Sequence, residues 1–432
     1  MTTMEVGEGP RRAGEMRRTA NPRFPLFDSL RAIAALSVFA VHVPMVAGMS
    51  TDNPARAYLI QLNIGVAVFF LISGFLLYRP FARSRYLRDS RPATIPYAER
   101  RALRIFPAYW VALAFTVLLL GKSGEARVAS AVFTPHGVPA YFGLLQVYDS
   151  NTLFGGISAA WTLCVELTFY AMLPLWAVLL RRFPVRSRSN FVRTELLALG
   201  GLFAIGVTWT SVAALNSHPT AAFLLDVTQI QPWLYVLPGF LDQFAVGMAL
   251  AVISVAIADR SAQPKAVQVI DRASWLPWLL AAFAFFLVAH VDGWFSGSIP
   301  AQLIATHELQ AVFAFALLLP AVFGDPTRGL VRRLLANRAL LWVGLVSYGV
   351  YLWHVAVLDK LDRLGVLDSL GGFGYIVVAL ALTLTVAAAS FYGVERHALR
   401  LSRRLSHRRR SQDADQRMHD LPRHERPDPG VP

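Results

Sequence analysis

Apolar runs of about 20 residues recur along this chain, and they limit its possible folds more than any other feature. A helix of that length crosses the ~30 Å hydrocarbon core of a bilayer. Hydrophobic residues make up 55% of the chain and charged residues 16%, a balance that excludes an ordinary soluble domain. The sequence therefore predicts an all-α integral membrane protein, a bundle of about ten transmembrane helices. The apolar runs are residues 28–48, 58–79, 104–121, 158–180, 195–215, 233–257, 275–291, 305–323, 340–358 and 373–395.

The basic residues lie mainly in the segments between these runs. With the N-terminus placed in the cytoplasm, the cytoplasmic segments carry 35 Lys and Arg residues and the opposite segments carry 5. Cytoplasmic loops of membrane proteins carry such an excess. The distribution predicts both termini in the cytoplasm. Basic residues are Arg except for Lys122, Lys265 and Lys360, which suggests a GC-rich bacterial genome, so we expect a multi-pass protein of a bacterial cytoplasmic (inner) membrane. Membrane orientation thus explains the formal charge of +14, and we expect the lipid bilayer, not a nucleic acid, as the partner of these basic residues.

We expect three segments along the chain. Residues 1–25 are polar and Arg-rich, and they predict a disordered basic segment in the cytoplasm. Residues 26–399 form the ten-helix membrane domain. Residues 400–432 are polar, Arg-rich and punctuated by proline, and they predict a disordered cytoplasmic tail.

Cysteine and histidine spacing predicts no metal centre. The single Cys164 excludes an intramolecular disulfide and a cysteine-based metal cluster, so we expect it to be a small packing residue. Four histidines in or near loops show no metal-ligand spacing: His136, His218, His290 and His307. We therefore expect no metal site and no tightly bound cofactor.

Two ionisable residues stand inside the first apolar run. Arg31 and His42 are eleven residues apart, and in a helix this spacing puts both on roughly one face, about 16 Å apart along the axis. An Arg in the bilayer interior costs roughly 2.5–3.5 kcal/mol on insertion scales, so such groups usually face a bundle interior or cavity. By depth, we place His42 with Glu166 of the fourth run and His354 of the ninth, in the outer half of the bilayer.

A second group of charges gathers at the cytoplasmic face. Arg101 and Arg104 share one helix face at the start of the third span, and Arg31 lies near the inner end of the first, close to Asp28. Guanidinium groups stay charged and donate in a bidentate fork that suits phosphates. We interpret this group as an anion-binding mouth on the cytoplasmic side.

The two groups together suit an acyl-coenzyme A. Its phosphates would bind at the arginines, and its pantetheine arm would bring the thioester near His42. A neutral imidazole there can act as general base on an acceptor hydroxyl, or accept the acyl group itself. Glu166 would orient this imidazole and stabilise its charged form.

Each of these features also has a simpler interpretation. Arginines at a cytoplasmic boundary are often topology anchors, and a histidine within a span is often a satisfied interhelical hydrogen bond. The pattern alone leaves an enzyme and a membrane transporter or acyl-group exporter open. A catalytically silent scaffold fits poorly with so many costly charges inside the membrane.

Six short motifs occur in order between about residues 24 and 399. They are Arg31 with His42 in the first span; Ser73 in FFLISGFLLYRP (69–80); Arg101 and Arg104 in ERRALRIFPAYW (99–110); Trp161 and Glu166 in AAWTLCVELTFYAMLP (159–174); Ser347, Tyr348 and His354 in SYGVYLWHVAVL (347–358); and Glu395 in SFYGVERHAL (390–399). In these motifs the chain resembles the bacterial membrane acyltransferase family 3, integral-membrane O-acyltransferases that depend on acyl-CoA.

The resemblance implies His42 as the essential catalytic residue and the inner-face arginines as contacts to acyl-CoA, which is a co-substrate. Two positions depart from the family pattern: His397 replaces a proline, and Leu167 stands where an acidic residue often follows Glu166. We therefore expect Glu166 to be a supporting residue. The chain is expected to be a stand-alone member without the fused esterase-type domain of some relatives.

The expected function is O-acylation. We expect transfer of an acyl group, acetyl in the first instance, from cytoplasmic acyl-CoA to a hydroxyl of a glycan, a lipid-linked sugar or a secondary metabolite such as a macrolide. Polysaccharide modification is one such activity. The alternative is a transporter or acyl-group exporter without ester-forming chemistry.

Overall fold

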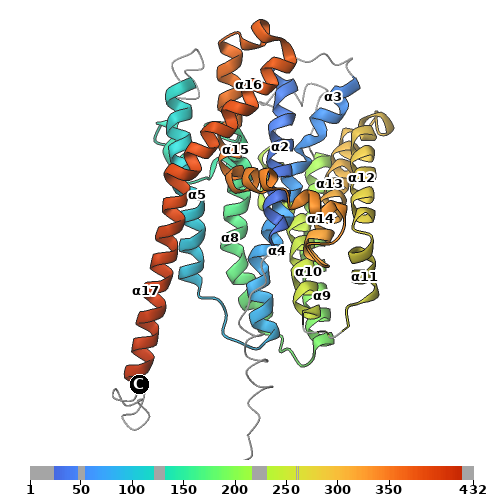
Figure 1. The fold of residues 1–432 in the computed structure, drawn as a ribbon, viewed down its shortest axis with the longest axis vertical. Coiled ribbons are helices and arrows are strands. Elements are labelled where there is room, and N and C mark those ends of the chain that lie inside the picture. The colour runs from blue at the N-terminus through green and yellow to red at the C-terminus, as the bar shows by residue number, and fades with distance from the viewer. Residues whose placement is uncertain are drawn as a thin grey trace, which may run out of the picture.

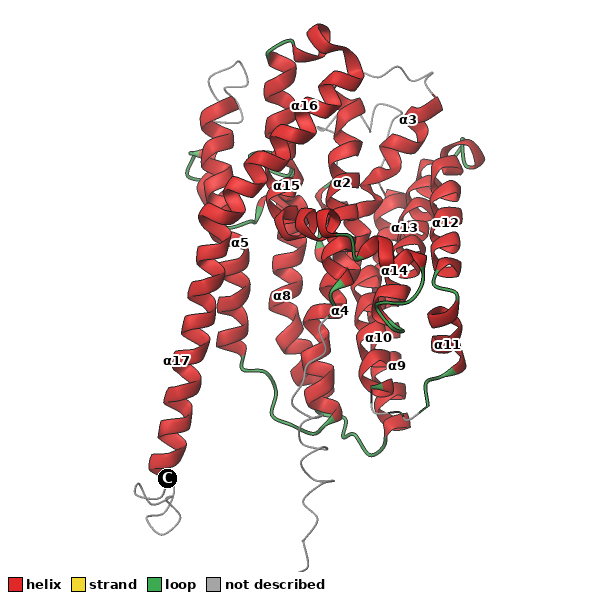
Figure 2. Ribbon diagram, viewed as in Figure 1, coloured by secondary structure: helices red, strands yellow, loops and turns green. Residues whose placement is uncertain are grey.

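A computed structural model describes residues 24–46, 54–120, 132–216, 231–258, 260 and 262–420. The predicted N-terminal segment lies outside these residues except for its last two positions. No strand occurs in the described part of the chain, which is helical with short connections (Figure 2). The helices are α2 (Leu26–Val46), α3 (Pro54–Leu59), α4 (Gly65–Tyr86), α5 (Thr94–Leu120), α7 (Gly137–Phe142), α8 (Trp161–Leu180), α9 (Arg188–Asn216), α10 (Leu241–Ile257), α11 (Lys265–Arg272), α12 (Trp275–Trp294), α13 (Ile299–Val322), α14 (Leu330–Leu335), α15 (Arg338–Arg363), α16 (Val366–Ser390) and α17 (Arg396–Asp420).

The predicted membrane bundle is confirmed. Ten helices in the described residues are long and apolar enough to cross a membrane, and each overlaps one of the ten predicted runs. Large apolar side chains cover the outside of the bundle: Leu197 of α9 is 67% exposed and Phe283 of α12 is 56% exposed. Such a surface suits lipid and not water, so the chain is a multi-pass membrane protein.

The long helices pack through glycines. A Cβ atom at Gly74 of α4 would overlap the backbone of Phe244, and one at Gly247 of α10 would overlap the backbone of Leu71. These reciprocal contacts let α4 and α10 lie backbone to backbone. Similarly, Gly344 of α15 lies against the backbone of α2, so α2 has close neighbours on both sides (Figure 1).

The structure shortens one predicted loop. Residues 79–104 were expected to connect two spans in the cytoplasm, but α4 continues to Tyr86 and α5 begins at Thr94. The basic residues of this stretch therefore lie mostly on helices. Arginine is a good helix former, so helical structure continues past the apolar run that marks the span.

The C-terminal segment also differs from its prediction as a disordered tail. Residues 396–420 form one helix, α17, which runs beside α5 (Figure 1) and joins it through an ion pair between Arg409 and Glu99. No glycine or proline occurs between Gly393 and Pro422, so nothing in the sequence breaks the helix before that proline. The rest of the tail, residues 421–432, lies outside the described residues.

A π-helical turn, Phe391–Glu395, joins α16 to α17. Such turns are rare and contain one residue more per turn than an α-helix. Phe391 and Glu395 are both buried, so the turn directs a carboxylate into the protein interior.

Candidate active site

A cavity of about 210 Å³ lies between α2, α4, α5, α8 and α15. Its polar lining consists of Arg31, Ser73, Arg101, Arg104, Thr162, Glu166, Tyr170, Ser347, Tyr348 and Tyr351. Its apolar lining consists of Val66, Phe69, Phe70, Ile72, Leu76, Leu77, Ile105 and Leu163. Three guanidinium groups and one carboxylate line it, and two of the arginines, Arg31 and Arg104, also pair with carboxylates outside the lining. With a single carboxylate and no imidazole, the lining suits an anion and not a metal ion.

The arginines of the cytoplasmic group all reach this cavity, from two different helices. Arg31 of α2 donates through Nη1 to Asp28 Oδ1 at 2.9 Å, and its side chain keeps 29% of its surface exposed. Arg101 of α5 makes no ion pair within the described residues, and its guanidinium lies 6.0 Å from the ring centroid of Tyr170. Arg101 therefore has a charge that the protein itself leaves uncompensated.

Arg104 is held by the turn between α16 and α17. Its Nη1 lies 3.7 Å from Oε2 of Glu395, whose side chain is 1% exposed. The same guanidinium lies 5.8 Å from the ring of Tyr348, and the Tyr348 hydroxyl donates to the carbonyl of Ile105 at 2.9 Å. A buried carboxylate and an aromatic face thus fix Arg104 at the cavity wall.

Glu166 belongs to the arginine end of the site. Its carboxylate accepts hydrogen bonds from the Ser73 hydroxyl at 3.1 Å and from the hydroxyl of Tyr170, one helical turn further along α8. No hydrogen bond or ion pair connects Glu166 with His42 in the described part of the chain. The expected contact between this carboxylate and the imidazole is therefore not formed.

His42 pairs instead with His354 of α15. His42 Nδ1 lies 2.8 Å from the carbonyl of Val38, and His354 Nδ1 lies 2.8 Å from the carbonyl of Tyr351. Since a carbonyl only accepts, both hydrogens are assigned to Nδ1 from these partners. His354 Nε2, 3.3 Å from His42 Nδ1, then shares that hydrogen as an acceptor. This arrangement leaves the lone pair of His42 Nε2 available to take up a proton.

Tyr351 connects the cavity with the histidine pair. It lines the cavity, and its ring centroid lies 5.9 Å from that of His354. Its hydroxyl donates to the Ala159 carbonyl at 2.6 Å and lies 2.6 Å from the Thr162 hydroxyl, which ties α15 to the start of α8. Neither His42 nor His354 is among the lining residues, so the pair lies behind Tyr351.

The remaining residues predicted from the motifs take different positions. Ser347 lines the cavity, and its hydroxyl donates to a backbone carbonyl of its own helix at 2.8 Å. Trp161 does not line it; its ring packs against Tyr235 and Phe240, at 5.0 and 5.6 Å between centroids. Cys164 is fully buried, in agreement with a packing role.

Three polar lining residues were not singled out from the sequence. Tyr170 follows Glu166 by four residues, and Tyr351 precedes His354 by three, so each shares a helix face with a residue that was recognised. Thr162 is the neighbour of Trp161. A hydroxyl one helical turn from a buried ionisable group is the signal that would have found the two tyrosines.

A family model described as an acyltransferase domain matches residues 25–392, which is most of the chain. No solved structure matches the chain.

Curated relatives carry related names. Nodulation protein 10 of Rhizobium leguminosarum bv. viciae is 28% identical over 406 residues, covering 89% of this chain and 96% of that protein. The O-acetyltransferase OatA of Staphylococcus aureus is 24% identical over 385 residues, covering 87% of this chain but 57% of OatA. The acyltransferase MdmB of Streptomyces mycarofaciens is 30% identical over 168 residues, covering 38% of this chain and 42% of MdmB.

Proposed function

Because the chain belongs to the acyltransferase 3 family and is an O-acyltransferase, we propose that it transfers an acyl group from cytoplasmic acyl-CoA to an acceptor hydroxyl. Because an O-acyltransferase forms esters, the alternative of a transporter or exporter without ester-forming chemistry is excluded. One observation carries the choice of donor: the cavity lined by three arginines is also lined by Tyr351, whose ring contacts His354 of the His42–His354 pair.

The charge of the cavity supports a phosphorylated donor. Arg101 makes no ion pair within the described residues, and guanidinium groups hold phosphates in bidentate pairs. The volume of about 210 Å³ is below the roughly 300–1,000 Å³ usual for a pocket that encloses a drug-sized ligand. The cavity therefore takes the narrow phosphopantetheine end of the donor, while the nucleotide stays outside.

His42 acts as the general base in this proposal. The acceptor oxygen attacks the thioester carbonyl, the new C–O bond forms and the C–S bond breaks. The hydroxyl proton passes to Nε2 of His42, which then protonates the departing sulfur so that coenzyme A leaves as a thiol. The hydrogen on Nδ1 stays bonded to the Val38 carbonyl and shared with His354 Nε2, which keeps the ring in the tautomer that this step requires.

The acceptor and the membrane orientation follow from the same reasoning. The excess of basic residues supports cytoplasmic termini in a bacterial inner membrane, with the arginines facing the cytoplasm and the histidine pair in the outer half. An acceptor that enters from the outer side is a glycan or lipid-linked sugar. The names of OatA and MdmB support acetyl transfer as the first assay, with secondary-metabolite hydroxyls such as those of macrolides as further acceptors.

The decisive experiment measures transfer from labelled acetyl-CoA by the protein in nanodiscs, with polysaccharide, lipid-linked sugar and macrolide acceptors. His42→Ala should lower kcat by about 10²–10⁴-fold, the usual contribution of a general base. His290→Ala is the control, because within the described residues the one hydrogen bond of the His290 side chain is to a carbonyl of its own helix, α12.

Two results would overturn the proposal. Normal acylation by His42→Ala would remove this residue from the mechanism. Transfer from acetyl phosphate but not from acetyl-CoA would remove acyl-CoA as the donor.

A further inference from the structure

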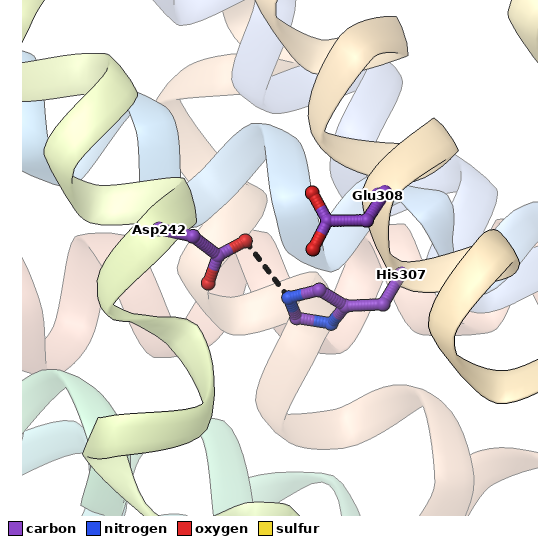
Figure 3. A group of neighbouring side chains, drawn as sticks. All are labelled: Asp242, His307 and Glu308. Carbon is purple, nitrogen blue, oxygen red and sulfur yellow. Dashed lines mark hydrogen bonds and ion pairs between the residues drawn. The ribbon is translucent and has the colours of Figure 1, made fainter. Parts of the chain in front are cut away.

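A second group of ionisable side chains lies where α10 meets α13, outside the cavity. Asp242 in the first turn of α10 and His307 and Glu308 of α13 point toward one another (Figure 3). His307 Nε2 lies 2.9 Å from Asp242 Oδ2, and one ligand atom from each residue lies within 4.8 Å of the other two. We call these three residues the α10–α13 cluster.

The charges of the α10–α13 cluster do not balance. The side chain of Asp242 is fully buried and that of His307 is 11% exposed. Even a protonated imidazole leaves one of the two carboxylates uncompensated. No Lys or Arg of the described chain forms an ion pair with either carboxylate, so the cluster lacks a positive charge in a region where a buried charge is costly.

Three oxygen atoms around the imidazole also lack hydrogen-bond donors. Asp242 Oδ1, Glu308 Oε1 and Gln243 Oε1 are buried without a partner. The Gln243 side chain amide lies beside the imidazole, its nitrogen 3.5 Å from His307 Nε2. That Nε2 has a single hydrogen, which it donates to Asp242, so it accepts nothing from the Gln243 amide and has no second hydrogen for the amide oxygen. Around this one N–H the cluster is a set of oxygens with no further donor among the described residues.

We propose that the α10–α13 cluster binds one divalent cation of the zinc or manganese type. A dication neutralises the two carboxylates with the imidazole uncharged. The donor set of one imidazole nitrogen and carboxylate oxygens suits these ions, with the Gln243 oxygen or water completing the shell. The cation takes the place of the Nε2 hydrogen between His307 and Asp242: the imidazolium form releases this proton to solvent, and the neutral ring that binds the metal keeps its hydrogen on Nδ1.

The geometry is close to what such an ion requires. Two ligand atoms at about 2.1 Å from a tetrahedral ion are about 3.4 Å apart. Separations of up to 4.8 Å therefore close by up to about 1.4 Å, through rotation of the partly exposed Glu308 side chain.

A cation at this place would join two helices near the cavity. Phe240, which precedes α10, lies 5.7 Å from the His307 ring and 5.0 Å from the ring of Phe70. Phe70 lines the cavity, so one aromatic layer separates the cation from the donor site. The cation therefore braces the cavity wall without contacting the substrate.

The test uses full-length protein purified without a polyhistidine tag, stripped with a chelator and dialysed against Zn²⁺ or Mn²⁺. We expect about one equivalent of metal by elemental analysis and a rise in Tm of at least about 2 °C on reloading. Asp242→Asn and Glu308→Gln should each weaken metal binding at least about tenfold and remove the rise in Tm.

The matched control is His136→Gln. His136 forms the same kind of pair with Asp149, at 2.8 Å, but the pair is exposed and has no second carboxylate beside it. This variant should bind metal as the wild type does. Wild-type protein that retains no ion and shows no change in Tm, or variants of the α10–α13 cluster that bind as tightly as the wild type, would overturn the proposal. If Asp242→Asn does not fold, the isosteric Glu308→Gln decides alone.

Discussion

The arginine-lined cavity and the α10–α13 cluster are both buried sites with unbalanced charge, but the sign and the access differ. In the cavity, three guanidinium groups face one carboxylate, and Arg31 and Arg104 keep 29% and 31% of their side chains exposed. In the cluster, two carboxylates face one imidazole, and Asp242 is fully buried.

The difference indicates two kinds of occupant. An accessible cavity whose arginines are already oriented by Asp28 and Glu395 suits a large anion that enters and leaves with each turnover. A closed site with unpartnered oxygens suits a small cation that remains bound. Each site has a charge without an ion-pair partner among the described residues: Arg101 in the cavity, and one carboxylate in the cluster. The sign of that charge indicates the kind of ligand that the site binds.

The largest effect should come from removing charge in the cavity. The double variant Arg101→Gln, Arg104→Gln loses two charge-assisted contacts to phosphate, and we expect the KM for acyl-CoA to rise at least about 100-fold. Steady-state kinetics with varied donor concentration measure this. Arg182→Gln is the control, since Arg182 is exposed beyond the end of α8. An unchanged KM would mean that Arg101 and Arg104 do not bind the donor and serve only to orient α5 in the membrane.

A smaller effect should follow from removing the carboxylate that orients Arg104. Glu395→Gln keeps the size of the side chain but loses the ion pair at 3.7 Å, and we expect about a tenfold rise in KM with kcat nearly unchanged. A fall in kcat with constant KM would instead place Glu395 in the chemical step.

Removal of a charge from the α10–α13 cluster should raise the stability of the protein, whereas removal of charge from the cavity should weaken donor binding. In the presence of a chelator, Glu308→Gln removes the repulsion between two carboxylates, so we expect a gain of about 1 kcal/mol in stability. Thermal unfolding in nanodiscs measures it. A lower Tm than wild type under these conditions would show that the cluster carries no surplus negative charge.

The smallest effect is expected at Ser73. Ser73→Ala removes one of the two hydroxyls that hold Glu166, while Tyr170 remains, so kcat/KM should fall by about threefold. A fall of 100-fold or more would mean that Ser73 contacts the substrate directly.

Much of the fold was predictable because membrane helices leave a strong signal in sequence. Runs such as 158–180 and 275–291 are apolar along their length, and backbone groups in a bilayer must be satisfied within the helix. The end of the chain was less predictable. An Arg-rich sequence without glycine or proline suits either a disordered tail or an exposed helix, and the ion pair of Arg409 with Glu99 depends on where α5 lies.

The site was predictable only as far as depth along a helix decides it. Arg31, Arg101 and Arg104 lie at the same end of their spans, and the structure brings all three to one cavity. Depth counted from a predicted span boundary misplaced Glu166, which was expected at His42 but bonds to Ser73 and Tyr170 at the arginine end of the site.

The α10–α13 cluster was missed for a related reason. Asp242 and His307 are 65 residues apart on different helices, and local spacing carries no sign of the contact.

The π-helical turn Phe391–Glu395 has a consequence for how the chain tolerates change in length. Its extra residue determines the orientation of the following side chains about the helix axis, because one residue corresponds to about 100° of rotation in an α-helix. Deleting a single residue there would turn Glu395 away from Arg104 and swing Arg409 away from Glu99 at the same time. Natural variants of this protein should therefore accept substitutions at residues 392–394 but no change in the number of residues in the turn.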